Sequence, residues 1–381
     1  MTLVLNAEGG GPRVDPSGQP ALVLRGLRKE FGDVVAVDGV DLEVKRGEFI
    51  TLLGPSGSGK TTTLRMVAGF TAQSSGSIQI DGLDMSHVPP YRRDVGMVFQ
   101  NYALFPHMTA AQNVAFPLEM RDTTKAEIKR RVADALQLVQ LPSHGARYPR
   151  QLSGGQQQRI ALARAVVFGP RLLLMDEPLG ALDKKLREAL QLEILHISRQ
   201  LGATVVYVTH DQEEALVMSD RIAIFRDGRI EQLGTGEDLY DRPVSLFVAD
   251  FIGESNILRG RFERDGDGGW LVREGWRGRI SPSAVARAGI VTGSAAALVV
   301  RPERLEVLAA DAPDRPGENS MTAKVRDVLF LGSMRKFELV LPDGQVAVAR
   351  SPIEPTGHAA GDTVKVAWEV DRGVLVAGPG G

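Results

Sequence analysis

The 381-residue sequence contains no cysteine. Disulfide bonds, thiolate metal sites and cysteine nucleophiles are therefore excluded, and the composition fits a reducing compartment. No apolar run approaches the roughly 18 residues that would span a bilayer, and residues 1–5 lack the basic start and apolar core of a signal peptide. The formal net charge of −2 gives no general attraction to nucleic acid or anionic lipid. We expect a cytosolic protein that reaches membranes only through partners.

The pattern along the chain predicts two folded regions behind a short tail. Residues 1–20 are rich in Gly and Pro and are expected to be flexible. Between 21 and 241, apolar strands alternate with amphipathic helices such as 125–139, which is typical of a mainly parallel α/β sheet. The character changes near 242, and after 251 helical periodicity gives way to short alternating strands and Gly, Pro and Asp turns as far as 381. This second region predicts a small β-barrel domain.

A phosphate-binding motif, GPSGSGKT, follows the apolar strand 49–53 and opens the helix 60–68. Its glycines allow backbone N–H groups to turn around a phosphate, and the helix N-terminus adds positive potential. Lys60 is expected to reach the β- and γ-phosphates of ATP, and the Thr61 hydroxyl to ligate Mg²⁺. A chance glycine-rich turn is the alternative interpretation. The residues predicted to contact nucleotide are Gly54, Pro55, Ser56, Gly57, Ser58, Gly59, Lys60, Thr61 and Thr62.

Two carboxylates, Asp176 and Glu177, end the apolar strand that begins at residue 171. At the carboxyl end of a central strand they would face the same crevice as the phosphate loop. Asp176 is then expected to hold Mg²⁺ through its water, and Glu177 to orient and polarise the water that attacks the γ-phosphate. The alternative is an acidic pair that caps a helix before Pro178. Gln100 and His210 end two further apolar strands.

The ordered set of GPSGSGKT, Gln100, LSGGQ at 152–156, Asp176-Glu177 and His210 resembles the ATPase subunits of ABC transporters. The resemblance covers residues 21–241 and implies a P-loop NTPase. Its parts are a RecA-like parallel-sheet core, an antiparallel β subdomain and a helical subdomain, followed by an OB-like β-barrel regulatory domain.

The resemblance also implies roles for the remaining residues. His210 would contact the γ-phosphate and link Glu177 to it, and the Gln100 amide would sense Mg²⁺ and water. The serine that precedes the helix 157–167 would point at the γ-phosphate of a partner copy, so that catalysis is shared in a homodimer. Asp183 would lie in the loop that crosses this interface. The residues implied to contact the partner's nucleotide are Ser153, Gly154, Gly155, Gln156 and Asp183.

Phe31 stands before the first predicted sheet, where this family places an aromatic residue that stacks on adenine. Most relatives have tyrosine there, and phenylalanine keeps the stacking surface. A buried core phenylalanine is the alternative.

The segments NYALFPHMT at 101–109 and RPERL at 301–305 resemble importer ATPases, most closely the spermidine/putrescine branch. This implies an ATP-hydrolysing subunit on the cytoplasmic face of the inner membrane. Its partners would be two integral-membrane permease subunits and, indirectly, a solute-binding protein. Ferric iron, sugars, thiamine-like cations and phosphonates remain alternative cargoes.

Two further interpretations concern other classes of function. A soluble ABC ATPase acting on DNA, ribosomes or Fe–S assembly usually has two ATPase halves, a long coiled coil or a basic surface, and the sequence has none of these. The β domain places Phe262, Trp270 and Trp276 among arginines, which can form a stacking platform for single strands. Interrupting acidic residues favour ordinary core aromatics, so no nucleic-acid partner is expected. A sensor that binds the solute or a regulatory protein also stays open for this domain.

Overall fold

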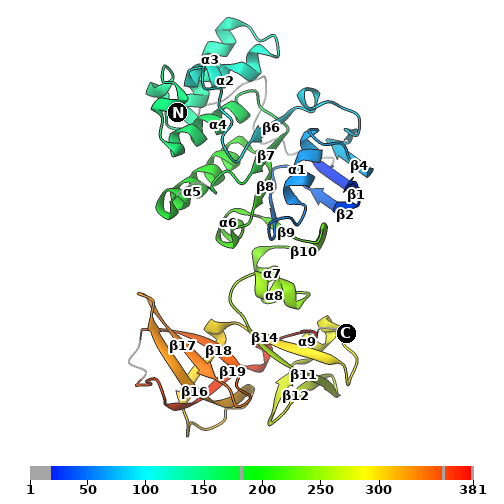
Figure 1. The fold of residues 1–381 in the computed structure, drawn as a ribbon, viewed down its shortest axis with the longest axis vertical. Helices are drawn as coiled ribbons and strands as arrows, with labels where there is room; N and C mark the ends of the chain where they lie inside the picture. Colours follow the sequence, from blue (N-terminus) through cyan, green and yellow to red (C-terminus); the bar gives the residue numbers. More distant parts are fainter. Residues whose placement is uncertain (1–18, 181–182, 354–356, 379–381) are drawn as a thin grey trace. The chain divides into compact units, whose positions relative to one another are not determined.

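The computed structural model of the chain describes residues 19–180, 183–353 and 357–378 (Figure 1). The expected tail, residues 1–20, lies outside the described residues except for its last two positions. Two compact units divide between Gly236 and Glu237. The division precedes the expected boundary between 241 and 242, and it places nearly all of helix α7 (Gly236–Asp241) in the second unit.

A six-stranded sheet forms the core of the first unit. Its strands lie in the order β10-β9-β3-β8-β7-β6, parallel except for β10 at one edge. Every residue of β3, β7 and β8 is buried, as expected for strands that are covered on both faces. The bounds are β3 (Phe49–Leu53), β6 (Val95–Val98), β7 (Leu172–Asp176), β8 (Thr204–Thr209), β9 (Arg221–Arg226) and β10 (Arg229–Gly234).

A second, antiparallel sheet has the order β2-β1-β4-β5. Its inward side chains, such as Leu24 and Val40, share one apolar cluster with Ile50 of β3 and Leu64 of α1. The sheet therefore packs against the parallel core, as predicted from the alternation of its residues. The bounds are β1 (Leu22–Phe31), β2 (Val34–Val44), β4 (Ser75–Ile80) and β5 (Leu83–Asp84).

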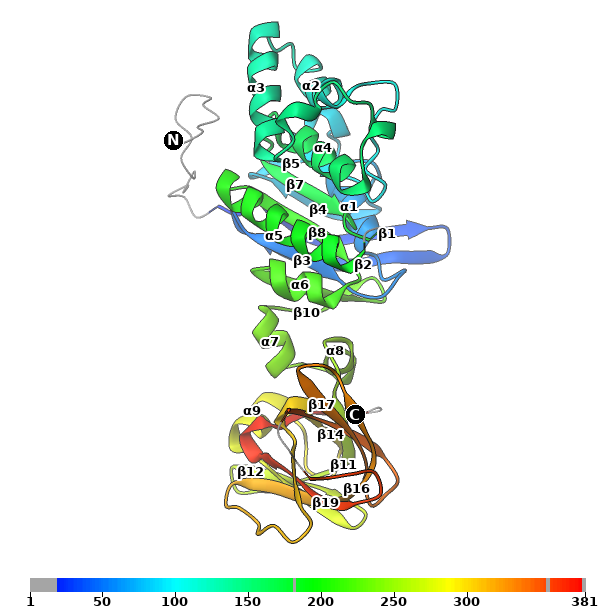
Figure 2. The same cartoon turned by 90° about the vertical axis from the view of Figure 1, so that its left-hand side faces the viewer.

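Three helices of the first unit, α2, α3 and α4, lie together and away from β1 and β2 (Figures 1 and 2). Leu136 of α3 and Ile160 of α4 belong to their common core, which also includes Ile194 of α5. The predicted apolar faces are therefore the buried ones. The bounds are α1 (Lys60–Ala68), α2 (Ala110–Glu119), α3 (Lys125–Leu138), α4 (Gly154–Val166), α5 (Lys184–Leu201) and α6 (Gln212–Met218), with short 3-10 turns at Pro90–Arg92, Pro142–His144 and Pro149–Gln151.

The second unit contains two antiparallel five-stranded sheets, β13-β12-β11-β14-β20 and β15-β19-β16-β17-β18. Phe262, Leu298, Phe337 and Trp368 from both sheets share one core, which is the arrangement expected for a small β barrel. The bounds are β11 (Asn256–Asp265), β12 (Gly268–Arg273), β13 (Trp276–Ile280), β14 (Ala295–Val300), β15 (Glu306–Ala309), β16 (Glu318–Phe330), β17 (Met334–Val340), β18 (Val346–Pro352), β19 (Thr363–Glu369) and β20 (Val374–Ala377), with 3-10 turns at Pro302–Arg304 and Val370–Arg372.

One helix of this unit, α9 (Pro282–Ala288), was not expected from the sequence. Ser281 caps its N-terminus, Pro282 occupies its first turn, and Gly289 ends it in a left-handed conformation. These are the ordinary start and stop signals of a helix. The expectation of strands alone was wrong here because seven residues are too few to show a helical period.

Two of the three aromatic residues considered for nucleic-acid stacking are core residues of the second unit. Phe262 is fully buried, and Trp276 packs against Trp368 with its indole N–H donating to the Ser320 carbonyl. Trp270 lies nearer the surface, where the Arg277 guanidinium covers its ring at 3.9 Å from the centroid. The interpretation as ordinary core aromatics is therefore confirmed for Phe262 and Trp276, whereas it was wrong for Trp270, which is not part of that core.

A buried arginine joins helices α7 and α8 (Leu246–Phe251) to the barrel. Arg301, 2% exposed, donates to the carbonyls of Tyr240 (2.8 Å) and Ala249 (2.9 Å) and lies over the Tyr240 ring. The Tyr240 hydroxyl donates to Glu303 at 2.6 Å, and burial, together with this bond, raises the pKa of Tyr240 to about 12. These contacts explain why the two helices group with the second unit.

Within the described ranges, no helix is long and apolar enough to cross a membrane.

Candidate active site

The phosphate-binding loop runs from the buried end of β3 to the start of α1, as predicted. Gly57 and Gly59 have φ values of +81° and +101°, which other residues rarely adopt. Gly54 is required for space, because a Cβ there would collide with the Phe225 carbonyl and lie 2.9 Å from the Ser58 hydroxyl. Among the described residues, no side chain caps the N-terminus of α1, so its first N–H groups face the loop and favour an anion.

Lys60 is the first residue of α1, and its side chain, 4% exposed, reaches back into this loop. Its Nζ donates to the carbonyl oxygens of Gly54 and Pro55, each at 2.8 Å. Burial lowers the pKa of Lys60, whereas the nearby carboxylates Glu177 and Asp176 raise it. The loop therefore closes around a cation, as a site for phosphate oxygens requires.

Asp176 and Thr61 meet beside the loop. The Thr61 hydroxyl donates to Asp176 Oδ1 at 3.1 Å, and Asp176 is 7% exposed at the end of β7. Burial raises the pKa of Asp176, and the bond from Thr61 partly opposes that effect. A hydroxyl and a carboxylate in contact are hard oxygen donors of the kind that Mg²⁺ takes together with water and phosphate.

Glu177 lies between Gln100 and His210. Its Oε2 accepts a hydrogen bond from Gln100 Nε2 at 3.3 Å and lies 3.2 Å from His210 Nδ1. The three residues follow β6, β7 and β8, whose carboxyl ends meet at the same sheet edge. Glu177 has a φ of +44°, an uncommon conformation for a residue with a side chain, and one that clusters at functional sites.

The LSGGQ segment begins helix α4. The Ser153 hydroxyl accepts from the Gln156 N–H, and the Gln156 side chain accepts from the Ser153 N–H, which forms a capping box. The helix starts at Gly154, so the expectation that these residues precede a helix starting at 157 was wrong. Serine caps a helix whose first turn contains both glycines. Gly155 provides space, because a Cβ there would lie 3.3 Å from Leu186 of α5.

Comparison with known proteins identifies the family. Residues 37–180 match the ABC transporter family, and residues 298–376 match the TOBE domain. The spermidine/putrescine import ATP-binding protein PotA of Thermobifida fusca is 47% identical to this chain over 94% of each protein. PotA 2 of Pseudomonas aeruginosa is also 47% identical, over 94% of this chain and 99% of its own. The chain belongs to the ABC transporter ATP-binding proteins.

Solved structures agree with this assignment. A dimeric ATP-binding cassette in a post-hydrolysis state with ADP and Pi is 32% identical, with a TM-score of 0.51 over 56% of this chain and 98% of that one. A dimeric bacterial ABC transporter cassette is 35% identical, with the same TM-score. The fold prediction of an ABC ATPase followed by an OB-like domain is thus confirmed.

The two sides of the predicted ABC site are separate in this chain. Lys60, Thr61 and Asp176 adjoin the cluster of Glu177, Gln100 and His210. In the part of the chain that the structure describes, no hydrogen bond or ion pair joins Ser153 or Asp183 to that group. Asp183 caps α5 by accepting from the Leu186 N–H at 3.0 Å, and residues 181–182 lie outside the description.

Phe31 ends β1 and is 53% exposed. The alternative of a buried core phenylalanine is therefore wrong. The Lys29 ammonium lies 4.7 Å from the ring centroid, so the ring already has a polar neighbour on its own strand face. An exposed aromatic surface is what adenine stacking requires, and the stacking itself stays a prediction.

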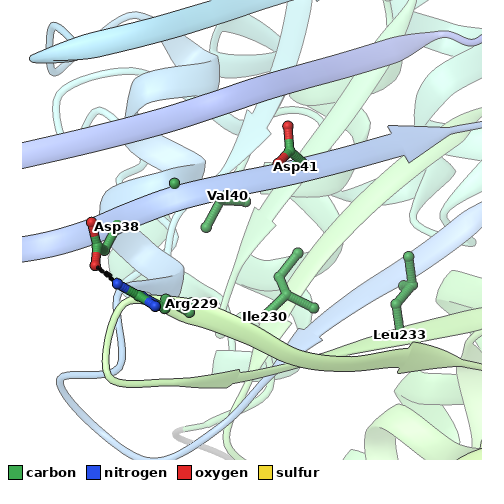
Figure 3. A pocket seen from close by; sticks show the side chains of 7 residues that line it. Asp38, Val40, Asp41, Arg229, Ile230 and Leu233 are labelled. Carbon is green, nitrogen blue, oxygen red and sulfur yellow. Dashed lines mark hydrogen bonds and ion pairs between the residues drawn. The ribbon is translucent and has the colours of Figure 1, made fainter.

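An open pocket of about 450 Å³ lies between β2 and β10 and contains none of these residues (Figure 3). Its carboxylate Asp38 is neutralised by Arg229 at 2.8 Å and by Arg28. The adjoining Gly228 donates its N–H to the Ser58 carbonyl and accepts from the Asp38 N–H. The β9–β10 turn therefore supports the phosphate loop from behind. The residues that line the pocket are Asp38, Gly39, Val40, Asp41, Arg229, Ile230 and Leu233.

Proposed function

We propose that this ABC ATPase energises a membrane importer of polyamines such as spermidine and putrescine. Hydrolysis is supported by one observation above all, the placement of Glu177 between Gln100 and His210 beside the buried Lys60. The cargo is supported by the relatives, which are named spermidine/putrescine import proteins and match over most of the chain. Ferric iron and sugars are the alternative cargoes.

Different residues of the site are proposed to bind the nucleotide, activate the attacking water and hold Mg²⁺. Lys60 and the loop N–H groups bind the β- and γ-phosphates, and Phe31 stacks on the adenine. Glu177 orients a water and takes up its proton while Gln100 and His210 hold the carboxylate in place. Thr61 and Asp176 would hold Mg²⁺, and the Gln100 amide would contact a water molecule bound to that ion. When bound, Mg²⁺ neutralises charge that develops on the phosphate oxygens.

Two copies of the chain complete two sites. Ser153 and the N-terminus of α4 of one copy are proposed to face the γ-phosphate held by the other, because Ser153 is exposed in the single chain. Asp183 then lies at the same interface. ATP binding closes this homodimer and drives two integral-membrane permease subunits at the cytoplasmic face of the membrane. A solute-binding protein would deliver the cargo to those subunits.

Uptake of labelled spermidine and putrescine tests the proposal in cells that lack this chain. Complementation with the wild type should restore uptake, and Lys60→Ala should not. A Lys125→Ala variant, changed on an exposed position of α3, provides a matched control. If polyamine uptake is unaffected by loss of the chain, the cargo is wrong, and labelled ferric iron and sugars would be measured next.

A further inference from the structure

His210 depends on its backbone for its position. More than half of its side chain is exposed, at 57%, and Nδ1 lies 3.2 Å from Glu177 Oε2. Packing alone does not fix an imidazole that is this exposed. Its direction is instead set by the chain at Thr209 and Asp211, where β8 ends and α6 is about to begin.

A buried carboxylate holds both of these neighbours. Glu214, 2% exposed, accepts from the Tyr207 hydroxyl at 2.8 Å and from the Thr209 hydroxyl at 2.7 Å, both on Oε2. The Thr209 hydroxyl in turn accepts from the Asp211 N–H at 3.0 Å. Hydrogen bonds therefore run from Asp211 to Thr209 and from Thr209 to Glu214, so the residues on both sides of His210 are connected.

The direction of this chain follows from the chemistry of its members. Thr209 Oγ1 has a single proton, and because it accepts from Asp211 it donates that proton to Glu214. Burial raises the pKa of the Tyr207 phenol well above its ordinary value, so the phenol is a donor at neutral pH. Burial also raises the pKa of Glu214, which the two hydroxyl bonds oppose.

An arginine on α5 joins the same group. Arg187 Nη1 donates to Asp211 Oδ2 at 2.9 Å, and its Nε lies 3.8 Å from Glu214 Oε1. Asp211 also caps α6 by accepting from the N–H groups of Glu213 and Glu214. Arg187 stands one turn after Asp183, whose carbonyl accepts from the Arg187 N–H at 2.9 Å. The start of α5 and the turn at His210 are thus joined through one guanidinium.

We propose that Glu214 and Arg187 are positioning residues for His210. Glu214 fixes the turn that presents the imidazole to Glu177. Arg187 links that turn to the N-terminus of α5, so a shift of α5 would also shift the turn. This inference rests on the proposed catalytic role of His210. Glu214 bonds to Thr209 and Arg187 bonds to Asp211, the two residues on either side of His210, so both act through the histidine.

The matched pair Thr209→Val and Thr209→Ser tests the chain of hydrogen bonds. Valine keeps the shape and removes the hydroxyl, whereas serine retains it. Steady-state phosphate release by the purified full chain should show kcat reduced on the order of tenfold or more in Thr209→Val, with KM for ATP within about twofold of wild type. Thr209→Ser should restore most of kcat. Glu214→Gln and Arg187→Met should reduce kcat in the same way.

A second buried ion pair controls for a merely structural effect. Glu48, 7% exposed, accepts from Arg221 Nη1 at 3.1 Å and from the Lys45 N–H at 2.6 Å, at the amino end of β3 and away from the catalytic edge. Glu48→Gln should lower the thermal midpoint and leave both kcat and KM unchanged. If Glu214→Gln fails to fold, the two Thr209 variants still decide the question.

The His210→Ala variant distinguishes a failure of the positioning inference from a failure of the catalytic role proposed for His210. If His210→Ala abolishes hydrolysis while Thr209→Val and Glu214→Gln keep wild-type kcat, the positioning inference is wrong and the proposed function survives. If His210→Ala itself hydrolyses ATP at the wild-type rate, the role assigned to the histidine fails, and the inference fails with it. A KM that rises as much as kcat falls would also contradict positioning.

Discussion

Replacing Glu177 by glutamine isolates the charge of the proposed catalytic base. Glutamine has nearly the same shape, so it can still bond with Gln100 and His210, but it cannot take up a proton at neutral pH. The backbone strain at residue 177, where φ is +44°, should be the same in the wild type and in Glu177→Gln, because both side chains are unbranched at Cβ. The fold should therefore be unaffected, and any change in rate reports on chemistry.

The expected loss follows from the role. A positioned general base contributes about 10²–10⁴-fold in rate, which corresponds to about 3–5 kcal/mol in the activation free energy. ATP affinity should not fall, because Lys60 and the loop N–H groups are untouched. Loss of a negative charge near the γ-phosphate should instead favour the ATP-bound homodimer.

Three measurements on Glu177→Gln check this reasoning. Phosphate release at saturating ATP and Mg²⁺ should be lost, a fluorescent ATP analogue should bind as it does to wild type, and light scattering should show a dimer that persists in ATP. Glu188→Gln is a matched control, because Glu188 on α5 is exposed and pairs only loosely with Lys184, at 4.0 Å. Undiminished steady-state hydrolysis by Glu177→Gln would refute the assigned role.

Three further substitutions test other parts of the site. Gly54→Ala should abolish ATP binding and cost about 1–3 kcal/mol of stability, since the new methyl group meets the Phe225 carbonyl; thermal unfolding and nucleotide titration measure this. Phe31→Ala should raise KM for ATP at least about fivefold through loss of stacking, while Phe31→Tyr should not; an equal KM in all three would exclude stacking. Asp176→Asn should end hydrolysis yet raise the nucleotide-free thermal midpoint. Burial raises the pKa of Asp176 above its ordinary 3.8, so its ionised form destabilises the fold only as pH rises through and beyond that value. The gain should thus be present at neutral pH and vanish as the pH falls below about 4, and a gain independent of pH would contradict this cause.

The nucleotide side of the site could be predicted because its signals are local. A strand, GPSGSGKT and a helix in succession place Lys60 and Thr61, and the carboxyl ends of parallel strands meet at one edge. That rule predicts that Asp176, Glu177 and His210 lie together, whereas Gln100 was assigned to the site by resemblance to the family. The contacts of Ser153 with a partner copy were implied by resemblance alone and remain predictions.

Other features depend on tertiary context that no short pattern reveals. The positive φ of Glu177, whose N–H donates to the Val208 carbonyl on the neighbouring strand, has no signal in the local sequence. The support of Ser58 by Gly228 joins segments that are far apart in sequence. Arginines are usually exposed, so nothing in RPERL indicates that Arg301 is buried among carbonyl groups. The sequence likewise does not indicate that Glu214 is buried and accepts hydrogen bonds from Tyr207 and Thr209.

The burial of Arg301 among the carbonyls of α7 and α8 limits where this protein can be cut or recombined. Because the guanidinium needs the Tyr240 and Ala249 carbonyls, a barrel that begins at residue 242 would keep the arginine and lose part of its cage. Exchange of modules between relatives should therefore use the junction between 236 and 237, so that the two short helices travel with the barrel. Helices α7 and α8 thus serve as the connecting segment of the barrel domain and belong with it in any exchange.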